Sequence, residues 1–128
     1  GSGYQAAVLG ELAAEVFTVE RIPELAGTAA RTLAELGCGN VTVVVGDGCR
    51  GLIEHAPFDA ILVAAAAPSV PPALRDQLAD GGILVVPIGE SAAVQALTLV
   101  RRTGTRFTIE EGTGCRFVPL IGEGAFDA

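Results

Sequence analysis

Apolar and polar positions follow two different periods along the first two thirds of the chain. Short runs of β-branched and aromatic residues are typical of buried parallel strands, and they occupy residues 16–19 (ending on Glu20), 41–45 and 58–64. Apolar residues at helical spacing fill residues 4–14 and the segment 23–36, where Pro23 marks the start and Gly37 the end of a helix. This alternation of strand and helix predicts an α/β fold.

The pattern changes toward the C-terminus. Pro71 and Pro72 open a short helix that runs to Leu78, and a turn at residues 80–82 leads into a fifth apolar strand at 83–86. After Gly89, strand-like segments at 96–102, 106–111 and 116–120 are separated only by the turns RTGT and EGTG. These turns leave no room for helices, so the segments are expected to add to the sheet edge in antiparallel orientation.

Length and composition narrow the class of protein. A chain of 128 residues, half of them hydrophobic, predicts one folded domain over residues 1–128 and excludes a disordered protein. The net charge of -7 disfavours binding to nucleic acid and to anionic membranes. Prolines interrupt the longest apolar stretch, ILVAAAAPSVPPAL, and no basic segment precedes an apolar run at the N-terminus. A cytoplasmic location is therefore expected.

The single histidine and the cysteines do not form a recognisable metal-binding pattern. Cys38, Cys49 and Cys115 are far apart in sequence, and His55 has no cysteine or second histidine close to it. Structural zinc sites need four such ligands at short spacings. We therefore expect no metal site and interpret His55 as a loop residue.

Candidate binding residues occur where the strands end. In an open parallel sheet, ligands bind beyond the carboxyl ends of the strands. The Gly1-Ser2-Gly3 turn at a helix start could let a ligand approach the backbone, Glu20 could accept the hydroxyls of a ribose, and Asp47 could accept an adenine amino group. Together they predict an adenosine-containing cofactor, which could be a nicotinamide dinucleotide or S-adenosylmethionine.

Several longer segments resemble one enzyme family, the protein-L-isoaspartate (D-aspartate) O-methyltransferases. The segments follow the family's order and spacing from residue 1 to about residue 122: GSGYQAAVL, VERIPELA, NVTVVVGDG, HAPFDAILVAAAAPSVPPAL, QLADGGILVVPIG and CRFVPLIG. The resemblance implies a Rossmann-like methyltransferase sheet that is mostly parallel, with antiparallel C-terminal strands. It also implies methyl transfer from S-adenosylmethionine to the α-carboxylate of L-isoaspartyl residues in damaged proteins, a repair reaction.

The resemblance assigns roles to individual positions. Gly1, Ser2 and Gly3 match the end of the family's glycine loop, which cradles the methionine part of the cofactor. Glu20 and Arg21 would flank the ribose, and Asp47 and Gly48 the adenine. Val118, in RFVPL, would contact the isoaspartyl peptide through its backbone. The reacting carboxylate is already ionised at neutral pH, so the resemblance implies no proton-transferring catalytic residue.

The chain departs from the family pattern at its start. Family members carry an N-terminal region and a first strand before the GSG loop, and this sequence begins at that loop. We therefore expect a truncated member with impaired activity, in which the strand ending at Glu20 and the strand starting at Phe58 each expose an unpaired edge. The alternatives are an inactive fragment or S-adenosylmethionine-binding module and, on the residues alone, an NAD-binding oxidoreductase domain.

Overall fold

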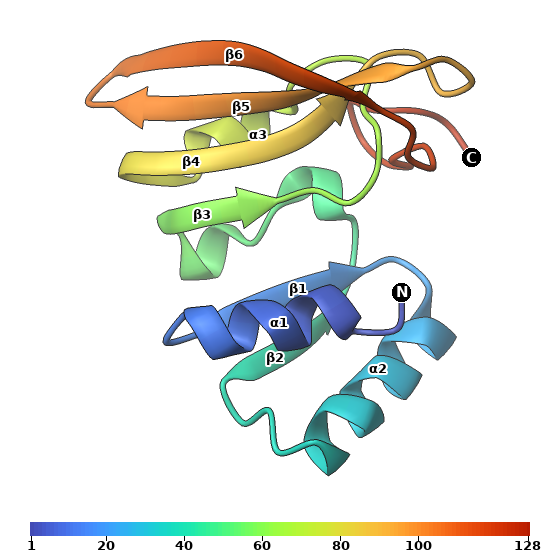
Figure 1. Cartoon of the computed structure of the whole chain (residues 1–128). Helices are drawn as coiled ribbons and strands as arrows, with labels where there is room; N and C mark the ends of the chain where they lie inside the picture. The colour runs from blue at the N-terminus through green and yellow to red at the C-terminus, as the bar shows by residue number, and fades with distance from the viewer. The chain divides into compact units, whose positions relative to one another are not determined.

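The computed structural model describes all residues from 1 to 128 and divides them into two compact units, Gly1–Gly48 and Cys49–Ala128 (Figure 1). Each unit contains its own sheet, with two strands in the first unit and four in the second.

The first unit has two helices and two parallel strands. Its elements are α1 (Tyr4–Leu12), β1 (Val16–Glu20), α2 (Pro23–Glu35) and β2 (Val41–Val45). Val16 lies opposite Val41 and Glu20 opposite Val45, so both strands end at the same edge of the unit. The predicted strands are confirmed, and both helices end slightly earlier than the apolar periodicity indicates.

Helix α1 packs closely on the start of β2. The Asn40 side chain donates hydrogen bonds to the carbonyl oxygens of Gly10 (2.8 Å) and Ala13 (3.0 Å), two acceptors at the C-terminal end of α1. This approach depends on the missing side chain at Gly10, because a Cβ there would lie 2.9 Å from Cγ2 of Val41 and 3.2 Å from Oδ1 of Asn40. Gly27, inside α2, has only the end of the Arg31 side chain nearby, at 3.7 Å.

Alanine substitutions at these two helical glycines are expected to change the free energy of unfolding in opposite directions. Gly10→Ala is expected to lower the free energy of unfolding by about 1–2 kcal/mol, because overpacking outweighs the gain in helix propensity. Gly27→Ala is expected to raise it by about 0.5–1 kcal/mol, because alanine reduces the entropy of the unfolded chain at an uncrowded site. Denaturant unfolding of both variants measures the pair, and a stabilising Gly10→Ala would contradict the close packing of α1 on β2.

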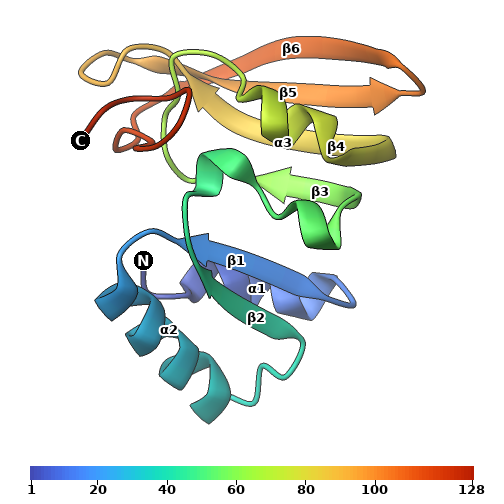
Figure 2. The ribbon, with the colours of Figure 1, turned by 180° about the vertical axis from the view of Figure 1, so that it is seen from behind.

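The second unit has a mixed four-stranded sheet in the order β3-β4-β5-β6. Its elements are two short 3₁₀ turns (Gly48–Arg50 and Ile53–His55, the first beginning at the boundary), β3 (Phe58–Leu62), α3 (Pro72–Asp76), β4 (Leu78–Ile88), β5 (Gln95–Thr103) and β6 (Arg106–Cys115). β3 and β4 are parallel, whereas β5 and β6 add in antiparallel orientation as predicted. Figure 2 shows α3 lying over one face of this sheet.

The core of the second unit lies between α3 and this face. The buried aliphatic side chains that form this core come from α3, β4, β5 and the segment after β3: Ala67, Leu74, Leu78, Leu84, Val86 and Val100. At one end of the core, the guanidinium groups of Arg75 and Arg102 lie 4.9 and 5.9 Å from the centre of the Phe107 ring. Arg102 also donates a 2.6 Å hydrogen bond to the carbonyl oxygen of Leu78.

Several predicted segments differ from the structure. β6 continues to Cys115 through EGTG, which is predicted as a turn, and β3 and α3 each end two residues before the predicted end, at Leu62 and Asp76. β4 begins at Leu78, five residues before the predicted strand, because the backbone continues through Asp80-Gly81-Gly82 as an irregularity in the pairing with β3. Residues 116–120 do not form a strand and contribute a single parallel bridge between Pro119 and Ala66. Proline has no N–H group to donate, which limits further pairing at that point.

Each sheet ends in a parallel strand with one free side. β1 pairs only with β2, and β3 pairs only with β4, so both strands have one edge without a neighbouring strand. This confirms the expectation that these two strands expose unpaired edges. Backbone groups on such an edge depend on water or on another chain for hydrogen bonding.

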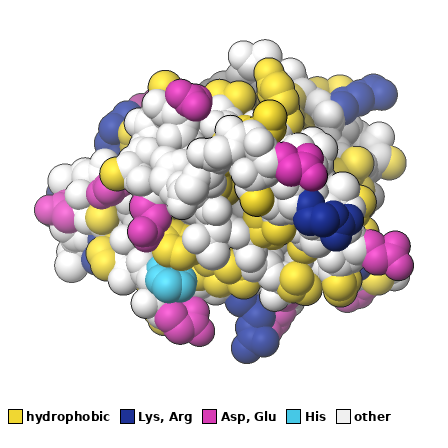
Figure 3. All heavy atoms as spheres, turned by 90° about the horizontal axis from the view of Figure 1, so that it is seen from below, with side chains coloured by type: hydrophobic (Ala, Val, Ile, Leu, Met, Phe, Trp, Pro, Cys, Tyr) yellow, Lys and Arg dark blue, Asp and Glu magenta, His cyan; other side chains and the backbone are white.

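The face of the molecule drawn in Figure 3 carries dispersed charge. On the face in Figure 3, acidic side chains (magenta) are spread among apolar and uncharged ones, and the basic side chains (dark blue) do not form a continuous patch. None of the helices has the length and apolar character needed to cross a membrane. Weak attraction to nucleic acid stays a prediction from the net charge.

Candidate cofactor and peptide sites

The first unit brings the predicted cofactor residues to one edge. The N–H of Gly46 donates a 3.1 Å hydrogen bond to the carbonyl oxygen of Glu20, which joins the ends of β2 and β1. Asp47 and Gly48 follow directly after Gly46, and the loop before α1 reaches Glu20 from the other direction. The glycine turn, the glutamate and the aspartate are therefore carried by adjacent segments, as the order of strands predicts.

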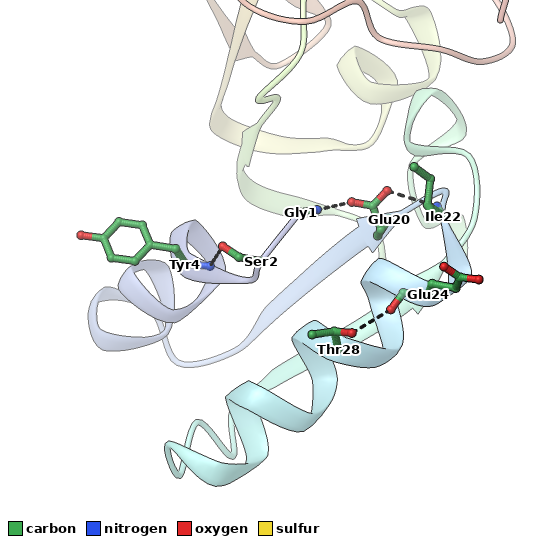
Figure 4. A network of polar contacts seen from close by, with 7 residues as sticks. All are labelled: Gly1, Ser2, Tyr4, Glu20, Ile22, Glu24 and Thr28. Carbon is green, nitrogen blue, oxygen red and sulfur yellow. Dashed lines mark hydrogen bonds and ion pairs between the residues drawn. The ribbon is translucent and has the colours of Figure 1, made fainter.

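The Glu20 carboxylate is held by two neighbours. Its Oε2 accepts a hydrogen bond and ion pair from the amino group of Gly1, and its Oε1 accepts a 3.1 Å hydrogen bond from the backbone N–H of Ile22 (Figure 4). The side chain is only 19% exposed. The contact with Gly1 shows that the loop and the carboxylate adjoin, and the contact with Ile22 fixes the orientation of the carboxylate.

These contacts determine the ionisation of Glu20. Burial alone would raise the pKa of its carboxyl group, but the hydrogen bonds from the Gly1 amino group and the Ile22 N–H, with the positive charge of that amino group, outweigh burial. The pKa of Glu20 therefore lies below its ordinary value. The carboxylate is charged at neutral pH and available as a hydrogen-bond acceptor.

The lowered pKa of Glu20 predicts a pH dependence of stability. A group with a depressed pKa stabilises the folded state above its unfolded pKa, and this stabilisation disappears as the pH falls through the folded pKa. The free energy of unfolding is therefore expected to fall in the acid range, and Glu20→Gln should make this fall smaller. Denaturant unfolding at a series of pH values tests this, and identical pH profiles for the two proteins would contradict it.

The Gly1-Ser2-Gly3 loop presents mostly backbone. Gly3 is the N-cap of α1 with φ +89°, a conformation that favours glycine, and a Cβ there would lie 3.3 Å from Ala29 Cβ and from Leu33 Cδ1. Ser2 Oγ accepts a 3.3 Å hydrogen bond from the Tyr4 N–H. A Cβ at Gly1 would meet no atom within 4 Å, so the start of the loop borders open space.

The remaining cofactor candidates lie on the same edge. Asp47 is half-buried, Arg21 is exposed, and a Cβ at Gly48 would meet no atom within 4 Å. A groove of about 320 Å³ in this unit lies along α2 and β2, and none of the predicted cofactor residues lines it. The structure therefore shows these residues as neighbours at an open edge of the unit.

Val118, the predicted peptide contact, belongs to the second unit and is 69% exposed. Its carbonyl oxygen accepts a 2.8 Å hydrogen bond from the Ala66 N–H, and Leu120 N–H donates to the Ala66 carbonyl at 2.7 Å. The expected backbone contact therefore cannot use the Val118 carbonyl without competing with Ala66. The N–H group and the exposed side chain of Val118 remain to meet a peptide.

Sequence reasoning did not identify the groups that hold these residues in place. The Ile22 N–H that fixes Glu20 and the Ala66 N–H that fixes Val118 are backbone groups, which no residue type indicates. No cluster of three or more His, Cys, Asp or Glu residues suitable for a metal ion occurs in the chain.

Solved structures support the methyltransferase fold. A protein-L-isoaspartate O-methyltransferase matches 98% of this chain and 40% of its own, with a TM-score of 0.88 and 30% sequence identity. A Plasmodium falciparum beta-aspartate methyltransferase in complex with S-adenosyl-L-homocysteine matches 93% of this chain and 58% of its own, with a TM-score of 0.71 and 24% identity. The second likeness supports the fold alone.

Curated relatives are identical to this chain at slightly more than half of the aligned positions. Protein-L-isoaspartate O-methyltransferase of Koribacter versatilis (strain Ellin345) is 56% identical over 122 residues, and that of Roseiflexus castenholzii (strain DSM 13941 / HLO8) is 55% identical over 122 residues. These matches cover 95% of this chain but 54% and 56% of the relatives, so the chain spans about half their length. The family described as protein-L-isoaspartate(D-aspartate) O-methyltransferase matches residues 1–125, and the chain therefore belongs to this family.

Proposed function

We propose that this chain carries the S-adenosylmethionine site of a protein-L-isoaspartate O-methyltransferase and takes part in methyl transfer to L-isoaspartyl residues of damaged proteins. The family match over residues 1–125 supports the reaction class. The observation that carries the proposal is the convergence of the Gly1–Gly3 loop, Glu20 and Asp47 at one edge of the first unit. The single domain and the cytoplasmic location predicted from the sequence stay predictions.

The residues at this edge fit an adenosyl group with a charged amino-acid tail. Glu20 supplies an anionic acceptor for ribose hydroxyls, provided that the Gly1 amino group shares or releases Oε2. The loop and Gly48 border open space where backbone can approach a ligand, and Gly3 begins a helix with no side-chain cap. In this proposal, Asp47 accepts the adenine amino group and Arg21 borders the ribose.

In this reaction the chain has to bind and orient S-adenosylmethionine and the isoaspartyl peptide. Bound S-adenosylmethionine supplies a methyl group on a positively charged sulfur. The accepting α-carboxylate of an isoaspartyl residue is ionised at neutral pH, so no side chain of the protein has to remove a proton. Val118 would hold the peptide through its N–H and side chain, and the rate would come from alignment and from exclusion of water around the carboxylate.

The oxidoreductase alternative does not agree with the comparisons. The family, the curated relatives and the solved structures described above are methyltransferases. A Gly-x-Gly turn followed by a strand-terminal glutamate is common to both cofactor classes and does not separate them. Binding without catalysis remains a distinct alternative, because the chain spans about half of its curated relatives.

A comparison of two ligands tests the proposed cofactor. S-adenosylhomocysteine is expected to raise the unfolding temperature of the chain, because a ligand that binds only the folded state stabilises it, and NAD is expected to leave it unchanged. An isoaspartyl-peptide methylation assay then separates an active enzyme from a binding module, and we expect no or very low activity from the chain alone. A larger shift with NAD would reject the methyltransferase cofactor.

Asp47→Ala tests the adenine contact separately. Loss of one buried hydrogen bond is expected to weaken S-adenosylhomocysteine binding by about 1–3 kcal/mol. Isothermal titration calorimetry measures this, with Asp59→Ala, an exposed aspartate on β3, as the charge-matched control. Equal affinity of Asp47→Ala and the unaltered chain would reject the adenine role.

A further inference from the structure

A buried glutamine joins three segments of the second unit. Gln95 opens β5 and is 2% exposed. Its Nε2 donates hydrogen bonds to the carbonyl oxygens of Glu90 (3.1 Å) and Ala93 (3.0 Å), and its Oε1 accepts from the N–H of Phe117 at 2.8 Å. One amide therefore ties the loop after β4 to the segment that carries Val118.

The surrounding backbone is shaped to admit this side chain. Gly89 has φ +153°, and a Cβ there would lie 3.1 Å from Cα and 3.2 Å from Cγ of Gln95. The amide uses both of its donor hydrogens and its acceptor, so no buried polar group of Gln95 is left unsatisfied. An apolar residue of the same size would remove the partner of the Phe117 N–H and of the Ala93 carbonyl, whereas the Glu90 carbonyl would keep the Ala93 N–H.

We propose that Gln95 is a positioning residue for the isoaspartyl peptide, an inference that rests on the proposed function and on the role of Val118 in it. Hydrogen bonds hold the backbone at Val118 and at the residue before it. Gln95 holds the N–H of Phe117, the preceding residue, and Ala66 holds the carbonyl of Val118 itself. These two hydrogen bonds fix the backbone that presents the Val118 N–H and side chain, and loss of the first would let this segment move.

A second buried glutamine provides a matched control. Gln77 is 5% exposed, its Oε1 accepts from the Leu52 N–H at 2.9 Å, and its Nε2 donates to the Arg50 carbonyl at 2.9 Å. It therefore closes a loop in the same unit by the same chemistry, without a hydrogen bond to the Val118 segment. Gln77→Leu reproduces the loss of a buried amide and leaves Phe117 in place.

The test compares Gln95→Leu and Gln77→Leu with the unaltered chain by NMR. The probes are a short isoaspartyl peptide and the same peptide with ordinary aspartate, both with saturating S-adenosylhomocysteine, because NMR titration measures weak binding. In Gln95→Leu, the Phe117 amide is expected to exchange about tenfold faster and the isoaspartyl peptide to bind about tenfold more weakly. Gln77→Leu should leave the affinity unchanged.

The outcomes separate this inference from the proposed function. If the unaltered chain prefers the isoaspartyl peptide and Gln95→Leu binds it equally well, or if Gln77→Leu weakens binding as much, the role of Gln95 is overturned and the function stands. If the unaltered chain does not distinguish the two peptides, the proposed function fails, and the role of Gln95 with it. If Gln95→Leu does not fold, Gln95→Asn replaces it in the same test. The amide of asparagine is one methylene too short to reach the Phe117 N–H.

Discussion

Glu20→Ala is expected to weaken S-adenosylhomocysteine binding about a hundredfold. The carboxylate would accept hydrogen bonds from both ribose hydroxyls, and hydrogen bonds to a charged group contribute about 1.5–3 kcal/mol each. Loss of two bonds at the lower value corresponds to about 3 kcal/mol, and each 1.4 kcal/mol is about a factor of ten in affinity. Isothermal titration calorimetry measures this change directly.

Glu24→Ala is the control for this experiment. Glu24 lies in the first turn of α2, four residues after Glu20, and is exposed. Its carbonyl oxygen, which accepts a 3.1 Å hydrogen bond from Thr28 Oγ1, is retained in the variant (Figure 4). The substitution removes the same charge and should leave the affinity within about twofold, since exposed charges contribute little. Equal loss of affinity in the two variants would show that Glu20 acts only through its negative charge and would contradict its hydrogen bonds to the ribose.

Amide exchange along β3 is expected to alternate by about a hundredfold between neighbouring residues. The N–H of Val63 donates to Val85 at 2.9 Å, and in a parallel ladder every second residue directs its N–H to the same partner. Ile61 and Val63 therefore face β4, whereas Ala60 and Leu62 face the side without a neighbouring strand. Unpaired amides at an edge exchange without unfolding of the sheet, and paired ones need an opening step.

Hydrogen exchange followed by NMR resolves these residues one by one. The central pair β4 and β5 is the internal standard, because both strands have neighbours on each side. Equal protection of all residues from 60 to 63 in a monomeric chain would show that another segment covers the β3 edge. That result would contradict the unpaired β3 edge.

Strand positions could be predicted from the sequence where a run of strand-forming residues stops at a turn residue. β2 matches its predicted range because five apolar and β-branched residues end at Gly46. The start of β4 was missed because Asp80-Gly81-Gly82 is a typical turn sequence, and only the pairing with β3 shows that the strand continues through it. Residues 116–120 have strand-like composition, but strand formation needs a continuous partner, and the structure provides one bridge.

In the candidate site, too, some features could be predicted from the sequence and others could not. Glycines and carboxylates at strand ends are visible in sequence because the apolar strand runs end on them, and the structure brings Glu20 to the Gly1 loop. The hydrogen bonds of Val118 to Ala66 and of Phe117 to Gln95 join residues that are 52 and 22 positions apart. Such pairings depend on the tertiary structure, so the sequence identified Val118 only through its resemblance to the family.

NMR mapping of S-adenosylhomocysteine on this chain tests the central claim most directly. The account predicts saturable shifts of the amide signals of Gly3, Glu20, Arg21, Asp47 and Gly48 with one common dissociation constant, and no comparable shifts with NAD. Saturable binding that moves other residues and leaves these five unchanged would contradict the assignment of this edge as the cofactor site.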